Sequence, residues 1–232
     1  MTISGSGVEA KIEDIFRAAF ICHQEGRLSD ARSLYSEILA LNPHHFDALH
    51  LSGLIAAQSG QPGLAVDLIN KAISINSEDA SAHKNLGIAL HNLENYVGAV
   101  DSYRRALSID PNDPEAFYNI GNAYLARSVF DEAISSYEKA ITLNPEHTNA
   151  HLNLGIALHE LGHHDLAIAS FDLAIALDPA FAEAFFSRGL ALEAIKQLEA
   201  ALVDFDRALI FSPKHHEARM HQDSLLRILG RI

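Results

Sequence analysis

A repeat of constant period is the feature that most constrains how this chain can fold. Six tripeptides share an apolar residue, then Asn, Asp or Ser, then Pro or Ser, and the step from each to the next is always thirty-four positions. They are Leu41-Asn42-Pro43, Ile75-Asn76-Ser77, Ile109-Asp110-Pro111, Leu143-Asn144-Pro145, Leu177-Asp178-Pro179 and Phe211-Ser212-Pro213. A fixed period of this length is typical of stacked supersecondary units.

The spacing of small and apolar residues within each unit predicts two helices. With Pro43 at position 32, positions 4, 7, 8 and 11 form one helical face, and positions 20, 24, 27 and 28 form a second. Position 8 is Gly or Ala and position 20 is Ala in all six units, so the two helices are expected to approach closely there. Gly26, Gly60 and Gly162 mark a turn between the helices. Proline at position 32 ends the second helix, and Asp113 is expected to cap the next one ahead of Pro114.

This pattern resembles the tetratricopeptide repeat family over residues 12–215. Unit four, PEAFYNIGNAYLARSVFDEAISSYEKAITLNPEH, is very similar to the family pattern, whereas unit one departs from it with Ala19 and Cys22. The resemblance implies an all-α, right-handed superhelical solenoid of six helix-turn-helix repeats. The expected organisation is a flexible leader at 1–11, repeats at 12–45, 46–79, 80–113, 114–147, 148–181 and 182–215, and a C-terminal capping helix at 216–232.

Composition narrows the function classes. The chain of 232 residues has 17 Lys and Arg against 30 Asp and Glu, a formal net charge of −13, which lacks the clustered cations of nucleic-acid-binding proteins. A single cysteine, Cys22, excludes an intrachain disulfide framework. We find no secretory signal and no apolar stretch long enough to span a membrane. We therefore expect a cytoplasmic protein that binds neither nucleic acid nor membranes, with a monomer favoured.

One motif suggests catalysis, but its place in the repeat argues against it. Residues 159–163 read His-Glu-Leu-Gly-His, the pattern of zinc proteases, and Glu183 follows at the spacing of a third ligand. His163 lies beyond the turn residue Gly162, so the motif is a helix end plus a turn. Glu183 belongs to the opposite end of the next helix, about 21 Å away at 1.5 Å per residue. We predict no catalytic residue, no metal site and no cofactor.

The first helices carry a second face that can bind a partner. Asn85, Asn119 and Asn153 occupy position 6 of three consecutive units, and a side-chain amide can pair with the backbone of an extended peptide. Positions 5 and 9 of the same face are mostly apolar, which marks a binding surface or else packing between neighbouring first helices. The predicted groove residues are Lys84, Asn85, Ile88, Tyr118, Asn119, Asn122, Leu152, Asn153 and Ile156. In the resembled fold this face lines a concave groove.

Two relatives with known ligands provide comparisons for this groove. The asparagine column resembles the ladder in the repeats of O-linked N-acetylglucosamine transferases, although asparagine is also common at this column elsewhere in the family. Chaperone-binding relatives clamp a terminal carboxylate with Lys and Arg; here Lys84 is present, but Ile88, Asn149 and Asn153 occupy the other clamp positions. The sequence thus predicts a non-enzymatic scaffold that binds a protein or peptide. The alternative is the substrate-recruiting arm of a glycosyltransferase whose catalytic domain is outside this chain.

Overall fold

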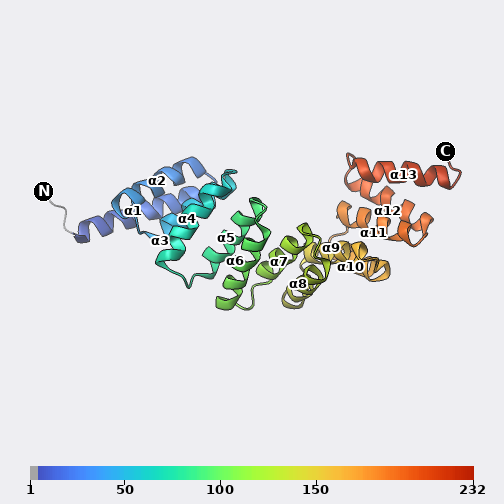
Figure 1. Cartoon of the computed structure of the whole chain (residues 1–232). Coiled ribbons are helices and arrows are strands. Elements are labelled where there is room, and N and C mark those ends of the chain that lie inside the picture. The colour runs from blue at the N-terminus through green and yellow to red at the C-terminus, as the bar shows by residue number, and fades with distance from the viewer. Residues whose placement is uncertain (1–4) are drawn as a thin grey trace. The chain divides into compact units, whose positions relative to one another are not determined.

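A computed structural model describes residues 5–232, and every regular element in that range is an α-helix (Figure 1). The first helices of the pairs are α1 (Gly5–Gln24), α3 (Phe46–Gln58), α5 (Ala80–Asn92), α7 (Pro114–Ala126), α9 (Thr148–Glu160) and α11 (Ala182–Ala194). The second helices are α2 (Leu28–Leu41), α4 (Pro62–Ile75), α6 (Tyr96–Ile109), α8 (Phe130–Leu143), α10 (His164–Leu177) and α12 (Leu198–Phe211), and α13 (His216–Ile228) follows. The predicted all-α fold of six helix pairs is confirmed.

The chain divides into two compact units, Met1–Pro111 and Asn112–Ile232, which we call the N-terminal and C-terminal units. The N-terminal unit contains three helix pairs, and the C-terminal unit contains three pairs and α13. Within each unit, a helix packs against its partner and against the next helix in the chain. The boundary lies between α6 and α7, two residues before the junction of the third and fourth repeats.

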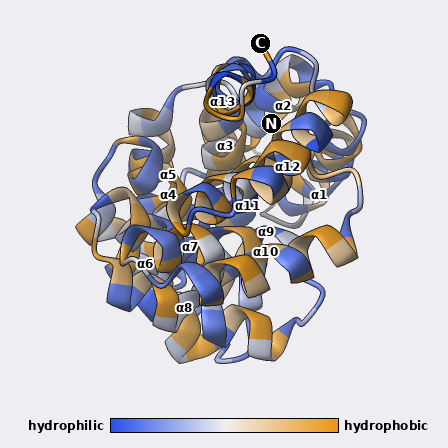
Figure 2. Ribbon diagram, turned by 90° about the vertical axis from the view of Figure 1, so that its right-hand side faces the viewer, coloured by the Kyte–Doolittle hydropathy of each residue, from blue (hydrophilic) through white to orange (hydrophobic). Residues whose placement is uncertain are grey.

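A close approach between the two helices of a pair forms the core of each repeat. A Cβ atom placed on Gly121 would lie 2.5 Å from Cε1 of Tyr137, and the same substitution at Gly155 would meet Phe171 at 2.5 Å. Tyr137 and Phe171 are almost completely buried, as is Ala133 of the all-alanine column. Figure 2 shows apolar and polar residues on the same helices, as this one-sided burial requires.

Side-chain caps fix where several first helices begin. Asp113 Oδ1 accepts the backbone N–H groups of Glu115 at 2.9 Å and Ala116 at 3.3 Å, which confirms the predicted cap of α7. At α9 the same role falls to His147, whose Nδ1 accepts the N–H of Ala150 at 3.3 Å. Such caps satisfy backbone donors that have no partner inside the helix.

In every repeat, one residue of the turn between the paired helices has a left-handed backbone conformation, always at the same position of the repeat. The predicted turn glycines Gly26, Gly60 and Gly162 have φ near +75°, and the equivalent residues Glu94, Ser128 and Lys196 also have positive φ, between +56° and +65°. The backbone therefore requires this conformation even where glycine is absent. Three of the six turns place a side chain in a region that costs non-glycine residues about 1–2 kcal/mol.

The predicted leader at 1–11 requires a correction. Helix α1 begins at Gly5, so residues 5–11 are helical, while residues 1–4 lie outside the described part of the chain. The helix extends because Val8 continues into this segment the apolar stripe that Ile12 and Ile15 form in the first repeat, and all three residues belong to or pack on the same core. At the other end, α13 packs on α12 through the fully buried Leu225.

None of the helices between residues 5 and 232 has the combined length and apolar character that crossing a lipid bilayer requires.

The close approach in repeat four can be tested by overfilling it. Gly121→Val should lower the free energy of unfolding by about 1–3 kcal/mol, because the new side chain meets the buried ring of Tyr137. Gly63→Val is the matched control, since a Cβ at Gly63 meets nothing within 4 Å. Urea unfolding of both variants measures the difference, and equal losses would contradict a packing origin.

The left-handed turn predicts substitutions of opposite sign. Lys196→Gly should raise the free energy of unfolding by roughly 0.5–1 kcal/mol, because glycine adopts positive φ without strain. Lys139→Gly, in the middle of α8, should lower it by about 1 kcal/mol through poorer helix propensity. Thermal melts of the two variants test this, and destabilisation by Lys196→Gly would show that the turn is unstrained.

Candidate functional site

Hydrogen bonds join three of the predicted polar groove residues of the C-terminal unit, Tyr118, Asn122 and Asn153, into one network. Asn153 Nδ2 on α9 donates to Asn122 Oδ1 at 2.9 Å and to the Tyr118 hydroxyl at 3.3 Å, both on α7. The Tyr137 hydroxyl on α8 donates to the same Asn122 oxygen at 2.8 Å. Burial raises the pKa of Tyr137, so its hydroxyl keeps the proton that it donates. Three helices thus hold these side chains in fixed positions.

The network leaves several polar groups unused. Each asparagine amide has one acceptor oxygen and two N–H hydrogens. In the network, Asn153 has both N–H hydrogens engaged and its Oδ1 open, whereas Asn122 has its Oδ1 engaged and its Nδ2 open. The half-buried Asn119 lies on the same helix as Asn122 and has no hydrogen-bond partner among the described residues. Donors and acceptors of the kind that pair with a peptide backbone therefore remain on this face.

In the N-terminal unit, the equivalent asparagine is engaged within the chain. Asn85 Nδ2 on α5 lies 2.8 Å from Nε2 of His50 on α3, and Nε2 must accept because the amide nitrogen only donates. Burial lowers the pKa of His50 and outweighs the negative charges of Asp79 and Asp47, which raise it. The lowered pKa favours the neutral ring, which can accept this bond. Lys84 and Ile88, predicted for the same groove, lie half-buried on α5. Asn85 thus links two neighbouring first helices.

Leu152 was predicted to lie on an exposed apolar strip, and this prediction is wrong. The side chain is buried, at 7% exposure, in the core that also contains Phe171 of α10 and Ala184 of α11. Position 5 here packs between repeats, which is the alternative that the sequence left open. Ile156, one turn further along α9, is half-buried against the same core.

A small pocket of about 190 Å³ adjoins this face of the C-terminal unit and extends the site beyond the predicted residues. Its lining residues are Ile156, His159, Glu160, Phe171, Glu183, Phe186, Ser187 and Leu190. Only Ile156 was predicted as a groove residue. Phe186, Ser187 and Leu190 occupy positions 5, 6 and 9 of the last repeat, so the column pattern contained the signal for them.

The apparent zinc-protease motif is divided between two helices, as its repeat position predicted. The expected separation of about 21 Å for Glu183 needs a correction, because Glu183 lines the same pocket as His159. Helix α9 ends at Glu160, Gly162 has φ +78°, and His163 is the N-cap of α10. The close neighbour of His159 is therefore His164, with 3.1 Å between their Nδ1 atoms, and not His163. Burial, followed by the effect of His164, lowers the pKa of His159, so this imidazole is favoured in its neutral form.

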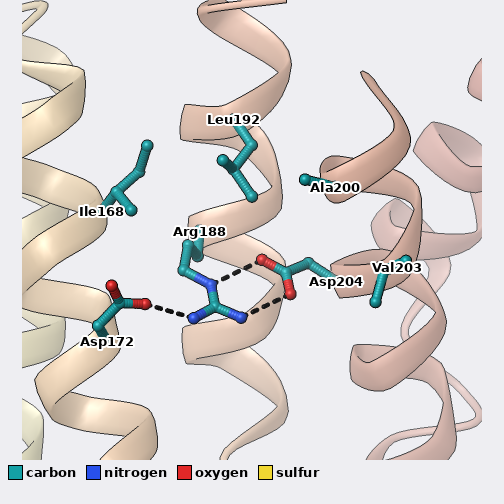
Figure 3. Close-up of a pocket in the computed structure, with 7 residues that line it drawn as sticks. All are labelled: Ile168, Asp172, Arg188, Leu192, Ala200, Val203 and Asp204. Carbon is teal, nitrogen blue, oxygen red and sulfur yellow. Dashed lines mark hydrogen bonds and ion pairs between the residues drawn. The ribbon is translucent and has the colours of Figure 1, made fainter. Parts of the chain in front are cut away.

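A second pocket of about 400 Å³ lies over α11, between α10 and α12, and contains an ion cluster that the sequence reading missed (Figure 3). Arg188 Nε and Nη2 donate to the two carboxylate oxygens of Asp204 at 2.8 and 2.7 Å, and Nη1 donates to Asp172. The hydrogen bond to Asp204 raises the pKa of Arg188 despite its burial. Since two carboxylates already hold the guanidinium, we assign the cluster to linking three helices.

The signal for this cluster was a charged residue at position 7 of one helix and another at position 23 of its partner helix. Arg188 occupies position 7, where Leu86, Ile120 and Leu154 stand in the three preceding repeats. Asp204, at 3% exposure, occupies position 23 of the facing helix. A charged residue in a core column of the first helix, with an opposite charge beside the core face of the second helix, indicates an ion pair.

Comparison with known proteins identifies the repeat. The family model described as "Tetratricopeptide repeat" matches residues 24–80 and 118–180, and the model described as "TPR repeat" matches residues 93–128. The chain belongs to the tetratricopeptide repeat family. None of the curated proteins matches this tetratricopeptide repeat chain.

Solved structures of other tetratricopeptide repeat proteins share the fold. The structure titled "Functional Characterization of Pseudomonas Aeruginosa pilF" matches with a TM-score of 0.79 at 19% sequence identity. The match covers 94% of this chain and 99% of the chain in that structure. YrrB, titled "a TPR protein with an unusual peptide-binding site", has a TM-score of 0.68 at 23% identity, with coverages of 82% and 97%. The first TPR of Spaghetti (RPAP3), bound to an HSP90 peptide, has a TM-score of 0.50 at 28% identity, with coverages of 50% and 93%.

The Asn85–His50 bond predicts that stability depends on pH. Because folding lowers the pKa of His50, the unfolded chain binds this proton more tightly, and acidification favours unfolding. The contribution is present above about pH 6.5 and is lost as the pH falls below that value. His50→Gln keeps an acceptor but does not titrate, so its loss of stability between pH 7.5 and 5.5 should be smaller than that of the wild type.

The control for this measurement is His44→Gln, since His44 is exposed. In urea unfolding at the two pH values, the His44→Gln variant should lose as much stability between pH 7.5 and 5.5 as the wild type does. Equal pH dependence of all three proteins would contradict the proposed role of His50.

Proposed function

We propose that this chain is a non-enzymatic protein-interaction scaffold and that its C-terminal unit binds an extended peptide segment along the face of α7, α9 and α11. The observation that carries the proposal is the network of Tyr118, Asn122 and Asn153, which fixes amide groups in place and leaves part of their hydrogen-bonding capacity open. Fixed side chains lose little conformational freedom when a ligand binds, which favours affinity.

The family supports this proposal. The repeat fold is typical of proteins that act as scaffolds, and two solved structures with this fold are described by a peptide-binding site or a bound peptide. The proposed contacts are backbone hydrogen bonds from Asn119, Asn122 and Asn153, with Ile156 supplying apolar contact beside them. The other predicted groove residues lie in the N-terminal unit, and their role in a contact surface there stays a prediction; they are Lys84, Asn85 and Ile88. A cytoplasmic location and a monomeric state also stay predictions from the sequence.

No observation on the described residues favours the glycosyltransferase-arm alternative. That comparison depends on an open ladder of asparagine amides. Asn85 and Asn153 instead donate to His50 and to Tyr118, the position-5 residue of the preceding repeat in each case. Their column thus has a structural role that does not require a glycosyltransferase.

The proposal is tested by removing the amide that has no partner within the described chain. Peptides selected from a displayed random library against the full chain supply the probe, and titration calorimetry measures their affinity. Asn119→Ala should weaken such a peptide by roughly 2- to 10-fold, since a net hydrogen bond contributes about 0.5–1.5 kcal/mol. The melting temperature should change little, because alanine is a good helix former.

Two further variants complete this test. Asn153→Ala should weaken both binding and stability, because it removes a ligand contact and the link between α7 and α9. Thr142→Ala, exposed on the second helix α8, is the matched control and should bind normally. If every selected peptide binds the Asn119→Ala and Asn153→Ala variants as tightly as the wild type, the peptide site is not on this face.

A further inference from the structure

We infer that the pocket beside the amide network recognises an apolar side chain flanked by lysine or arginine, so that this face prefers basic peptides and rejects acidic ones. The inference rests on the proposed peptide-binding function and names the class of partner. Three features carry it: the size of the pocket, its apolar wall and the charge at its rim.

The size of the pocket suits one side chain. Its volume of about 190 Å³ lies below the range of roughly 300–1,000 Å³ that is usual for small-molecule sites. The wall is apolar, formed by Ile156 of α9 together with Phe186 and Leu190 of α11. Burying an apolar side chain against such a wall is favourable, because it removes apolar surface from water.

The rim of the pocket carries carboxylates from both helices. Glu160 is the last residue of α9 and is exposed, and Glu183 lies in the first turn of α11 with its side chain 49% exposed. A peptide whose apolar side chain enters the pocket therefore has an acidic group from each helix within the same site. Opposite charges beside the anchor are favoured and like charges are disfavoured.

No cation of the pocket offsets these carboxylates. The eight described lining residues include neither lysine nor arginine, and His159 is favoured as the neutral ring. His215 Nε2 lies 3.4 Å from Glu183 Oε2, while its Nδ1 accepts the N–H of Ala218, so Nε2 carries the hydrogen of the ring. Arg188, on the same helix as Glu183, is held by Asp172 and Asp204 over the other pocket.

The charge of the whole unit acts in the same direction. Residues 112–232 contain 17 Asp and Glu against 9 Lys and Arg. Such an excess attracts basic segments over distances up to the screening length, about 8 Å at physiological salt. The occupant is therefore a partner segment with an apolar residue between or beside basic residues.

Three synthetic peptides of equal length test the inference on the full chain. They share a Gly-Ser background and differ only at the centre, which is Lys-Leu-Lys, Gln-Leu-Gln or Glu-Leu-Glu. Fluorescence anisotropy at low salt should rank the affinities in that order, with at least about a tenfold difference between the first and the last. Replacing the central leucine of the first peptide by serine should weaken it several-fold, because the pocket then stays empty.

Charge-removing variants locate the effect. Glu160→Gln and Glu183→Gln keep the shape of the side chain, and each should reduce the ratio between the lysine and glutamate peptides by up to about fivefold. Glu138→Gln, exposed on α8 away from the pocket, is the matched control and should leave the ratio unchanged. If the Glu138 control lowers the ratio as much as Glu160→Gln and Glu183→Gln do, the ranking comes from general charge and the pocket assignment is wrong.

The remaining outcomes separate this inference from the proposed function. Asn119→Ala should weaken the lysine and glutamine peptides by the same factor and preserve their ranking. If the lysine and glutamate peptides bind equally and both depend on Asn119, the peptide site stands and the basic preference is wrong. If no peptide binds the wild-type chain, both the site and the preference are overturned.

Discussion

The close approach of paired helices is the constraint on which the rest of this structure depends. Where Gly121 faces Tyr137 and Gly155 faces Phe171, the absence of a Cβ lets an aromatic ring lie against the helix backbone. The ring fills the space between the helices and excludes water, so each pair gains a dense core from few residues. A glycine faces an aromatic ring in this way in each of repeats three to six, and in repeat two Gly53 faces Ile69. Within the units, α3 therefore lies beside α5, α7 beside α9 and α9 beside α11.

That regular placement creates the candidate site. Residues 35 apart in sequence become neighbours, which is why Asn85 reaches His50 and Asn153 reaches Tyr118 by the same displacement along the repeat. These bonds link adjacent repeats and at the same time hold amide groups on the face that we propose for peptide binding. A structural role and a binding role are therefore compatible in Asn153, since its carbonyl oxygen remains open while its N–H groups are used.

Charge distinguishes the two pockets of the C-terminal unit. Over α11, Arg188 is neutralised by Asp204 and Asp172, and the cluster holds three helices together (Figure 3). Beside α9, Glu160 and Glu183 have no lysine or arginine within the described lining of their pocket. The charged groups of the larger pocket therefore serve to hold the helices together. Those of the smaller pocket present net negative charge to a ligand.

The sequence by itself determined the helix pairs and the small-residue columns where they pack, because these follow from the constant repeat period and from local chain chemistry. It did not give the start of α1 at Gly5, which lies before the first repeat. Proline, glycine and capping residues act within a few positions, so their effects can be read along the chain. The tertiary structure decided which side chains on the groove face of the first helices are exposed and which hydrogen-bonding groups remain open to a ligand. Leu152 and Ile156 share one predicted strip, yet one is buried and the other half-buried, since burial depends on the neighbouring repeat. The partners of Asn85, Asn153 and Arg188 lie 16 to 35 residues away, and only packing brings those side chains within bonding distance.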